Sequence, residues 1–191
     1  MQHHQNRPVT YWHEMPSSIG PLLLTGNGAA LTGVYFQAGP RPVRPHPHWL
    51  RLAAPFADAV RQLEEYFGGQ RQVFDLPLAP AGTAFQLAVW RALQGIAYGR
   101  TTSYGQLARE LGHAHGARAV GLANGSNPLP VIIPCHRVIG ADGSLTGFGG
   151  GLQIKRALLH LEGAACVTDL FSMRVSAAGP APPRAARAGE G

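Results

Sequence analysis

The chain has 191 residues and a formal net charge of +6, and Lys155 is its only lysine. Its two cysteines, Cys135 and Cys166, show no CxxC spacing, which argues against a disulfide framework and against a cysteine-based zinc site. No apolar run approaches the ~20 residues needed to span a bilayer, and the N-terminus lacks an apolar signal core, so we expect a soluble, intracellular protein with no membrane partner. Cys166 has no supporting motif and is interpreted as structural.

The first half of the chain predicts a small sheet followed by a helix. Three β-like runs come first, over residues 9–12, 22–25 and 31–36. Gly26-Asn27-Gly28 predicts a hairpin turn between the last two runs. The proline-rich stretch 41–55 predicts a loop, and its two histidines lack a third ligand, so no metal site is expected there. Apolar spacing predicts a helix over 56–67, stopped by Gly68-Gly69, and then a short strand over 72–78.

The composition divides the chain into two domains. Ala79-Pro80-Ala81-Gly82 is typical of a linker. The predicted parts are a flexible N-terminus (1–8), an α/β support domain (9–80), a mostly helical domain (83–166) and a disordered tail (176–191).

The second domain predicts helices with clear start signals. Four are expected, over residues 83–96, 103–111, 116–124 and 154–161. Thr83 with Gln86 and Ser103 with Gln106 form capping-box patterns. The second and third helices, joined by a short turn with glycine, are typical of a helix-turn-helix, although an ordinary αα-corner explains this pattern equally well. The glycine-rich stretch 140–151 predicts a loop without a phosphate-binding motif.

A thiol beside an imidazole is the most informative feature of the second domain. Cys135 and His136 follow a very apolar run, and His136 and Arg137 can each help to form the reactive thiolate. Asn127 and Glu162 are polar residues in otherwise apolar surroundings, and a Cys135–His136–Glu162 relay would suit proton transfer. Three alternatives remain open at this point: a cysteine hydrolase, a DNA-binding regulator without chemistry, and a buried structural cysteine.

The stretch Ile133-Pro134-Cys135-His136-Arg137-Val138-Ile139 resembles the O6-alkylguanine-DNA alkyltransferase family, also called the methylated-DNA-protein-cysteine methyltransferases. Further matches follow the same order along the chain: Ala117-Arg118-Ala119-Val120-Gly121, Asn127-Pro128, Gly150-Gly151-Leu152, Lys155 and Glu162-Gly163. The resemblance covers residues 83–163, and the N-terminal half matches more loosely through 18–22 and 66–68. It implies an α+β protein with a ribonuclease H-like N-terminal domain and a winged helix-turn-helix-like motif in the C-terminal domain.

The resemblance implies a DNA repair protein that is consumed by its own reaction. It would act as a monomer in the cytoplasm or at the nucleoid, bind double-stranded DNA through the minor groove, and rotate O6-alkylguanine out of the stack. The alkyl group would pass irreversibly to Cys135, with O4-methylthymine as a second expected substrate. No cofactor is implied, and the zinc site of some relatives is not expected because no cysteine precedes Cys135.

The resemblance also implies roles for individual residues. His136 resembles the water-assisted base, Glu162 its orienting partner, and Asn127 the brace of the cysteine turn. Tyr104 would help to expel guanine, and Arg118 would fill the stack in place of the flipped base. Further DNA contacts are expected at Ser103, Ala117 and Gly121, and the substrate is expected to contact Arg137, Val138, Phe148 and Gly149. Some relatives have an aromatic hydroxyl and a serine where this chain has Phe148 and Gly149, so we expect backbone N–H groups to serve there.

Overall fold

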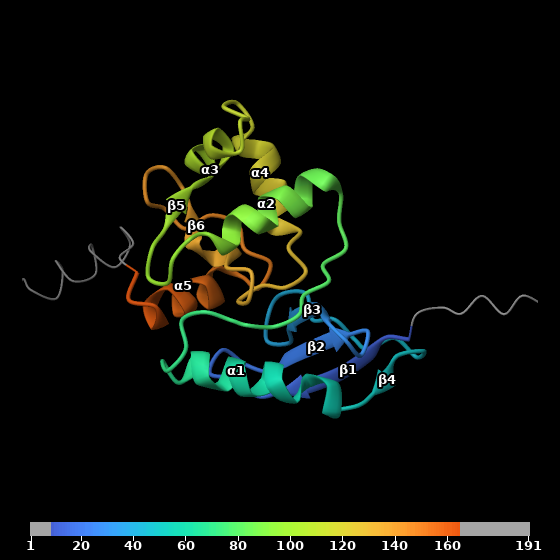
Figure 1. The fold of residues 1–191 in the computed structure, drawn as a ribbon. Coiled ribbons are helices and arrows are strands. Elements are labelled where there is room, and N and C mark those ends of the chain that lie inside the picture. The colour runs from blue at the N-terminus through green and yellow to red at the C-terminus, as the bar shows by residue number, and fades with distance from the viewer. Residues whose placement is uncertain (1–8, 165–191) are drawn as a thin grey trace, which may run out of the picture.

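The computed structural model describes residues 9–164 (Figure 1). The predictions for residues 1–8, for Cys166 and for the tail 176–191 lie outside this range, as does the end of the predicted helical domain. No helix within residues 9–164 is both long and apolar enough to cross a bilayer.

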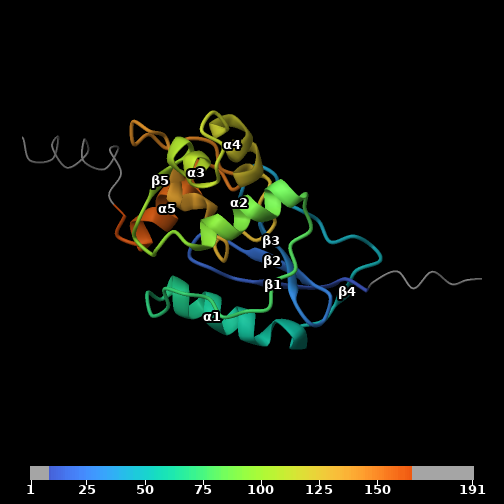
Figure 2. The ribbon, with the colours of Figure 1, turned by 45° about the horizontal axis from the view of Figure 1, so that its top comes forward.

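The N-terminal half is a four-stranded sheet with a helix on one face. The strands are β1 (Tyr11–Met15), β2 (Leu22–Gly26), β3 (Leu31–Phe36) and β4 (Leu50–Arg51), in the order β3-β2-β1-β4. β2 runs antiparallel to β1 and β3, whereas β4 runs parallel to β1. β2 is buried along its whole length, because helix α1 (Ala57–Phe67) covers one face of the sheet and the helical half lies on the other (Figures 1 and 2). Two residues of the predicted loop 41–55 thus form a strand, β4.

The predicted hairpin between β2 and β3 is confirmed. The Asn27 side chain stabilises its turn, because Oδ1 accepts hydrogen bonds from the backbone N–H groups of Ala29 (3.0 Å) and Ala30 (2.9 Å). Gly28 has φ +94°, a conformation that L side chains rarely adopt. The turn residues therefore help to fix the register that places Leu31, Val34 and Phe36 of β3 in the core.

The predicted helix over 56–67 is confirmed as a short 3-10 turn (Ala54–Phe56) followed by α1. Its inner face buries Ala59, Leu63 and Tyr66, while Arg61 on the exposed face pairs with Asp58 and Glu65. The helix is thus amphipathic, and burial of the inner face holds it against the sheet.

The predicted strand over 72–78 is wrong. Only Leu78 forms a bridge, with Leu31 of β3. The backbone of Asp75 bonds to a side chain instead: Gln62 Nε2 donates to the Asp75 carbonyl (2.7 Å), and the Asp75 N–H donates to Gln62 Oε1 (2.9 Å). A buried glutamine on α1 therefore satisfies backbone groups that a neighbouring strand would otherwise satisfy.

The C-terminal half is mostly helical. Its elements are α2 (Ala84–Gln94), β5 (Thr102–Ser103), α3 (Tyr104–Glu110), α4 (Ala117–Gly125), a 3-10 turn (Cys135–Arg137), β6 (Val138–Ile139) and α5 (Leu152–Leu161). The four predicted helices are confirmed, and β5 pairs with β6 in parallel. Thr83 and Gln86 form a complete capping box. Ser103 caps α3 by accepting from the Gln106 N–H (3.1 Å), whereas the Gln106 side chain donates to Glu110 instead.

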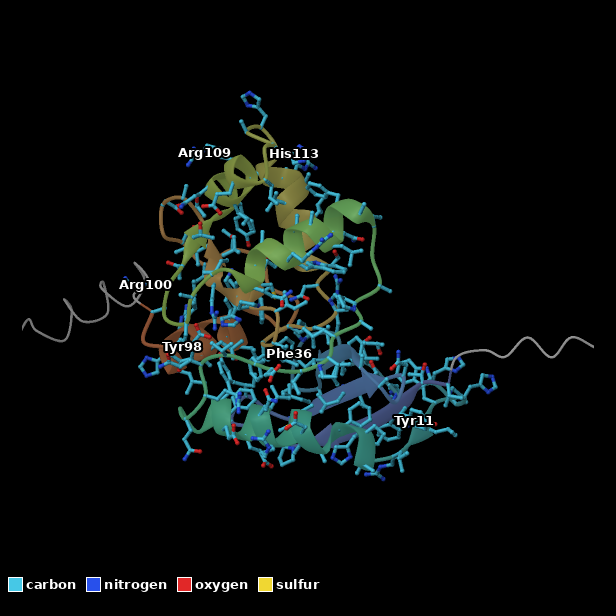
Figure 3. All side chains as sticks on the ribbon, in the orientation of Figure 1. Tyr11, Phe36, Tyr98, Arg100, Arg109 and His113 are labelled. Atoms are coloured by element: carbon cyan, nitrogen blue, oxygen red, sulfur yellow. The ribbon has the colours of Figure 1, made fainter. Side chains whose placement is uncertain are left out.

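The two halves share one apolar core and are joined by main-chain and aromatic contacts. The Val34 N–H of β3 donates to the Pro128 carbonyl (2.8 Å), which ties the sheet to the segment before the cysteine. Phe36 lies at this junction (Figure 3), with its ring 5.5 Å from that of Phe148. A Cβ at Gly150 would lie 2.6 Å from the Phe36 ring, so the glycine permits the close approach. The end of β3 therefore packs directly on the glycine-rich loop.

Candidate active site

The cysteine lies after a tight reversal of the chain over residues 127–133. The Asn127 side chain holds this reversal, since Nδ2 donates to the Ile133 carbonyl (2.8 Å) and Oδ1 accepts from the Leu129 N–H (3.0 Å). Within it, Val131 has φ +75°, which is rare for a β-branched residue. Such a backbone is strained and persists only where its surroundings hold it. Asn127 thus fixes the path that delivers Cys135 to the site.

Cys135 begins the 3-10 turn and is only 4% exposed. Burial raises the pKa of its thiol to about 11, although a hydrogen bond from Asn127 and the charge of Lys155 oppose this effect. The resting side chain is therefore a thiol at neutral pH. A nearby base must take its proton before the sulfur can attack carbon.

His136 is fully buried and is oriented by a carboxylate. Its Nε2 lies 2.8 Å from Glu162 Oε1, and its Nδ1 is buried without a hydrogen-bond partner among the described residues. Burial lowers the pKa of His136, and Glu162 opposes this. An ionised Glu162 accepts the hydrogen of Nε2, so Nδ1 is the nitrogen that is free to take up a proton.

Glu162 is held by donors from both halves of the protein. Its oxygens accept hydrogen bonds from His136 Nε2 (2.8 Å), from Tyr66 Oη (2.7 Å), from Arg137 Nε and Nη2 (both 2.9 Å) and from the Gly99 N–H (3.3 Å). Burial raises the pKa of the carboxyl group, but the bonds from His136 and Arg137 outweigh it and bring the pKa to about 2. The carboxylate is therefore charged and fixed in direction.

The Arg137 side chain, expected from the sequence to contact the substrate, bonds to other residues of the protein. Its guanidinium is 2.9 Å from Glu162, donates to the Ile96 carbonyl (2.5 Å) and lies over the Tyr98 ring. The side chain is only 6% exposed, so it is not available to a bound base. Its partner comes from 25 residues further along the chain, which no local pattern reveals.

Lys155 is a site residue to which the sequence reasoning gave no role. It is fully buried on α5, and its Nζ donates to the carbonyls of Val138 (2.7 Å) and Thr146 (2.8 Å). Nζ also lies 6.0 Å from the centre of the Tyr104 ring. Burial lowers the pKa of Lys155 to about 8. In the sequence, the one signal for Lys155 was its position as a lone lysine on the apolar face of a predicted helix. In the structure, its ammonium group links the segment after the cysteine turn to the glycine-rich loop.

A cavity of about 240 Å³ opens beside Cys135. Its walls come from both halves: Val34, Tyr35, Phe36 and Arg41 on one side, and Asn124, Gly125, Asn127, Pro130, Gly147, Phe148 and Gly149 on the other. Phe148 and Gly149, expected to contact substrate, thus line it. Val138 is fully buried, and its side chain is not part of the cavity wall.

The predicted DNA-contacting residues lie on α3 and α4. Tyr104 begins α3, and a Cβ at Gly121 of α4 would lie 3.7 Å from the Tyr104 ring, so the two helices meet at this point. Burial raises the pKa of Tyr104, whose hydroxyl therefore stays protonated. Arg118 is exposed and forms no ion pair within residues 9–164, and Ala117 and Ser103 are partly buried. Arg118 therefore does not join the Cys135 cluster but lies on the outer surface of α4.

The part of the chain that the structure describes contains no group of three histidine, cysteine, aspartate or glutamate residues placed to hold a metal ion.

Known proteins match this chain over most of its length. Residues 10–80 match the model of the 6-O-methylguanine DNA methyltransferase ribonuclease-like domain, and residues 84–164 match that of the DNA binding domain of the same proteins. The methylated-DNA–protein-cysteine methyltransferase of Methanosarcina acetivorans is 48% identical over 154 residues, which cover 81% of this chain and 99% of that protein. The chain belongs to the methylated-DNA–protein-cysteine methyltransferase family.

Other members of this family are also similar to the chain over most of its length. The methyltransferase of Mycobacterium bovis is 48% identical over 163 residues, covering 85% of this chain and 98% of its own. Among solved structures, Mycobacterium tuberculosis OGT in complex with DNA superposes with a TM-score of 0.75 at 47% identity, over 84% of this chain and 99% of that one. The family resemblance drawn from the cysteine turn is therefore confirmed.

Proposed function

We propose that this methyltransferase is a single-use DNA repair protein that transfers a methyl or larger alkyl group from O6 of guanine in duplex DNA to Sγ of Cys135. One observation carries the proposal: the Cys135 thiol lines a cavity, and the next residue in the chain, His136, has a buried imidazole that a charged carboxylate orients. In the reaction an S–C bond forms as the C–O bond breaks, guanine leaves, and a thioether remains. The thioether is a poor leaving group, so each molecule reacts once.

The buried relay supplies the proton transfer that the thiol needs. With a pKa of about 11, Cys135 must pass its proton to the free Nδ1 of His136, directly or through water. Glu162 then stabilises the imidazolium through Nε2, and its own low pKa keeps it from taking the proton. Asn127 and the Lys155 charge favour the thiolate. The leaving guanine carries negative charge, which a hydrogen bond donated by the Tyr104 hydroxyl would stabilise.

We propose that α3 and α4 form a helix-turn-helix, within a winged helix-turn-helix-like domain, and that α4 enters the minor groove. The small residues Ala117 and Gly121 support this, because they let the backbone of α4 approach DNA closely. A thiolate cannot reach O6 in line inside a stacked duplex, so the nucleotide must rotate out. The exposed Arg118 would fill the gap. The domain 9–80, which we propose to be ribonuclease H-like, would brace the reacting domain 83–166.

The test is intact-mass analysis after incubation with a duplex that contains O6-methylguanine. We expect a gain of one methylene per protein, located on the Cys135 peptide and complete at one equivalent. Cys135→Ser is the control and should bind the duplex without gaining mass. An unmodified Cys135, or repeated turnover, contradicts the proposal; turnover of an ester or peptide would instead indicate a hydrolase.

A second experiment isolates the part played by α4. Arg118→Ala should slow the repair of duplex DNA far more than the reaction with free O6-benzylguanine, because only the duplex requires a flipped nucleotide to be held out. Equal losses on the two substrates would show that Arg118 does not act on the duplex.

A further inference from the structure

A tyrosine of the N-terminal half donates directly to the carboxylate of the relay. Tyr66 lies near the end of α1 and is fully buried. Its hydroxyl donates to Glu162 Oε1 at 2.7 Å, across 96 residues of sequence. The same oxygen accepts from His136 Nε2 at 2.8 Å. The N–H of His136 and the hydroxyl of Tyr66, from the other half of the protein, therefore bond to the same atom, Glu162 Oε1.

This contact differs from the ordinary hydrogen bond of a buried tyrosine. Any backbone carbonyl could satisfy a buried hydroxyl, but here the acceptor is an ionised side chain of the reaction centre. Burial and the Glu162 charge both raise the pKa of Tyr66, so the hydroxyl remains a donor. The rings of Phe67 and Phe74, each with its centre 5.3 Å away, fix the Tyr66 ring. Packing in the N-terminal half, together with the Tyr98 ring 6.1 Å away, thus sets the position of the donated hydrogen.

Arg137 and Tyr66 hold the relay carboxylate from different elements of the protein. Its Nε and Nη2 each donate to a different oxygen of Glu162, which sets the plane of the carboxylate. The Tyr66 hydroxyl approaches from another element and adds a third donor to Oε1. A carboxylate with donors from two directions keeps its Oε1 aimed at His136, and an aimed Oε1 keeps the hydrogen on Nε2 and leaves Nδ1 free.

We propose that Tyr66 is a positioning residue of the alkyl transfer, so that the N-terminal half takes part in the reaction through Glu162. The inference rests on the function proposed above, in which His136 accepts the thiol proton. It assigns the sheet domain a role in setting the rate, in addition to its role in packing.

Tyr66→Phe tests the proposal, because it removes one oxygen and keeps the ring. Tyr98→Phe is the matched control: its hydroxyl lies in the same region but donates to the Leu161 carbonyl (3.1 Å) and not to Glu162. The probe is free O6-benzylguanine, which needs no base flipping. Single-turnover rates would be measured across pH, and the final extent of benzylation would count the competent protein in each sample, so that a loss of folded protein is not read as a loss of rate.

We expect Tyr66→Phe to slow transfer on the order of 10-fold, as for a lost hydrogen bond to a charged group, and Tyr98→Phe to stay within about 2-fold of the parent. The acid limb of the Tyr66→Phe profile should move to higher pH, since a carboxylate with fewer donors raises the pKa of His136. If Tyr66 were only structural, Tyr66→Phe would lower the stability of the protein but leave the pH–rate profile of the competent molecules unchanged. That result would overturn the proposal.

A double substitution separates action through Glu162 from other effects. In a Glu162→Gln background, Tyr66→Phe should produce little further loss of rate, because the charged acceptor is already gone. Additive losses would also overturn the proposal. If the parent protein itself fails to accept a benzyl group, the proposed function is wrong; if the parent reacts and Tyr66→Phe matches it at every pH, only the role of Tyr66 is wrong.

Discussion

The buried carboxylate of Glu162 should control stability as well as chemistry, and its removal gives a quantitative prediction. Glu162→Gln replaces a charged acceptor with a neutral amide and leaves the buried Arg137 guanidinium without its ionic partner. Breaking a buried pair in this way costs about 3–5 kcal/mol of unfolding free energy. That is a large part of the ~5–15 kcal/mol typical of a folded protein.

The pH dependence provides the sharper signature. The folded-state pKa of Glu162 is about 2, against 4.5 for the free side chain, so its charge stabilises the fold above pH 4.5 and this contribution is lost as the pH falls toward 2. At neutral pH the contribution is about 3 kcal/mol; about 1 kcal/mol of it is lost by pH 4 and about 2 kcal/mol by pH 3. The gap in stability between the parent and Glu162→Gln should therefore narrow by about 2 kcal/mol between pH 7 and pH 3.

The assay is urea unfolding at each pH, followed by both far-UV circular dichroism and tryptophan fluorescence. Coincident transitions would justify a single free energy of unfolding. Glu64→Gln is the control, because Glu64 is an exposed carboxylate of α1, and its gap to the parent should stay nearly constant. A Glu162→Gln variant that remains equally far below the parent at all pH values would refute the reasoning.

Three further substitutions test separate parts of the site. Lys155→Met removes the buried cation that lowers the Cys135 pKa, so the pH at which the rate of benzyl transfer begins to rise should be higher than in the parent. A pH–rate profile identical to that of the parent would contradict this. Asn127→Ala should cost about 1–3 kcal/mol in urea unfolding and slow transfer, whereas Asn27→Ala in the exposed hairpin should leave the transfer rate unchanged. Trp90→Phe removes the buried bond from Nε1 to the Ala123 carbonyl (2.8 Å) together with ring volume, and urea unfolding should show a loss of about 2–4 kcal/mol; a loss below 1 kcal/mol would mean that α2 and α4 do not depend on this contact.

Local signals in the sequence were enough to predict most of the secondary structure. The β2–β3 hairpin follows from Asn27 and Gly28, and α2 follows from its Thr83 capping box. The predicted strand over 72–78 failed because the Gln62 side chain takes the place of a neighbouring strand, and that pairing spans 13 residues across a helix and a turn. β4 was missed because it has only two residues and contacts β1 from a proline-rich loop.

The same limit applies to the site. The cysteine turn is contiguous, so Cys135 and His136 could be chosen from the sequence, and Glu162 was a candidate because it is polar in otherwise apolar surroundings. The family resemblance added its role as the orienting partner. Arg137 binds Glu162 from 25 residues away within the C-terminal half, and this pairing depends on how α5 packs on the cysteine turn. Tyr66 binds Glu162 from 96 residues away, and that pairing depends on how the two halves dock. Tyr66 is fully buried in the structure, and a buried tyrosine hydroxyl needs a hydrogen-bond partner, but nothing local to the sequence identifies Glu162 as that partner.

The hydrogen bond from the Val34 N–H to the Pro128 carbonyl joins the halves through main-chain atoms only. No side-chain replacement removes such a bond directly, apart from proline at position 34, which would lack the N–H. Side-chain replacements on either side of the junction therefore leave this bond in place. The Val34 amide also offers an intrinsic reporter: its hydrogen-exchange rate would measure how often the junction opens, without any label or substitution.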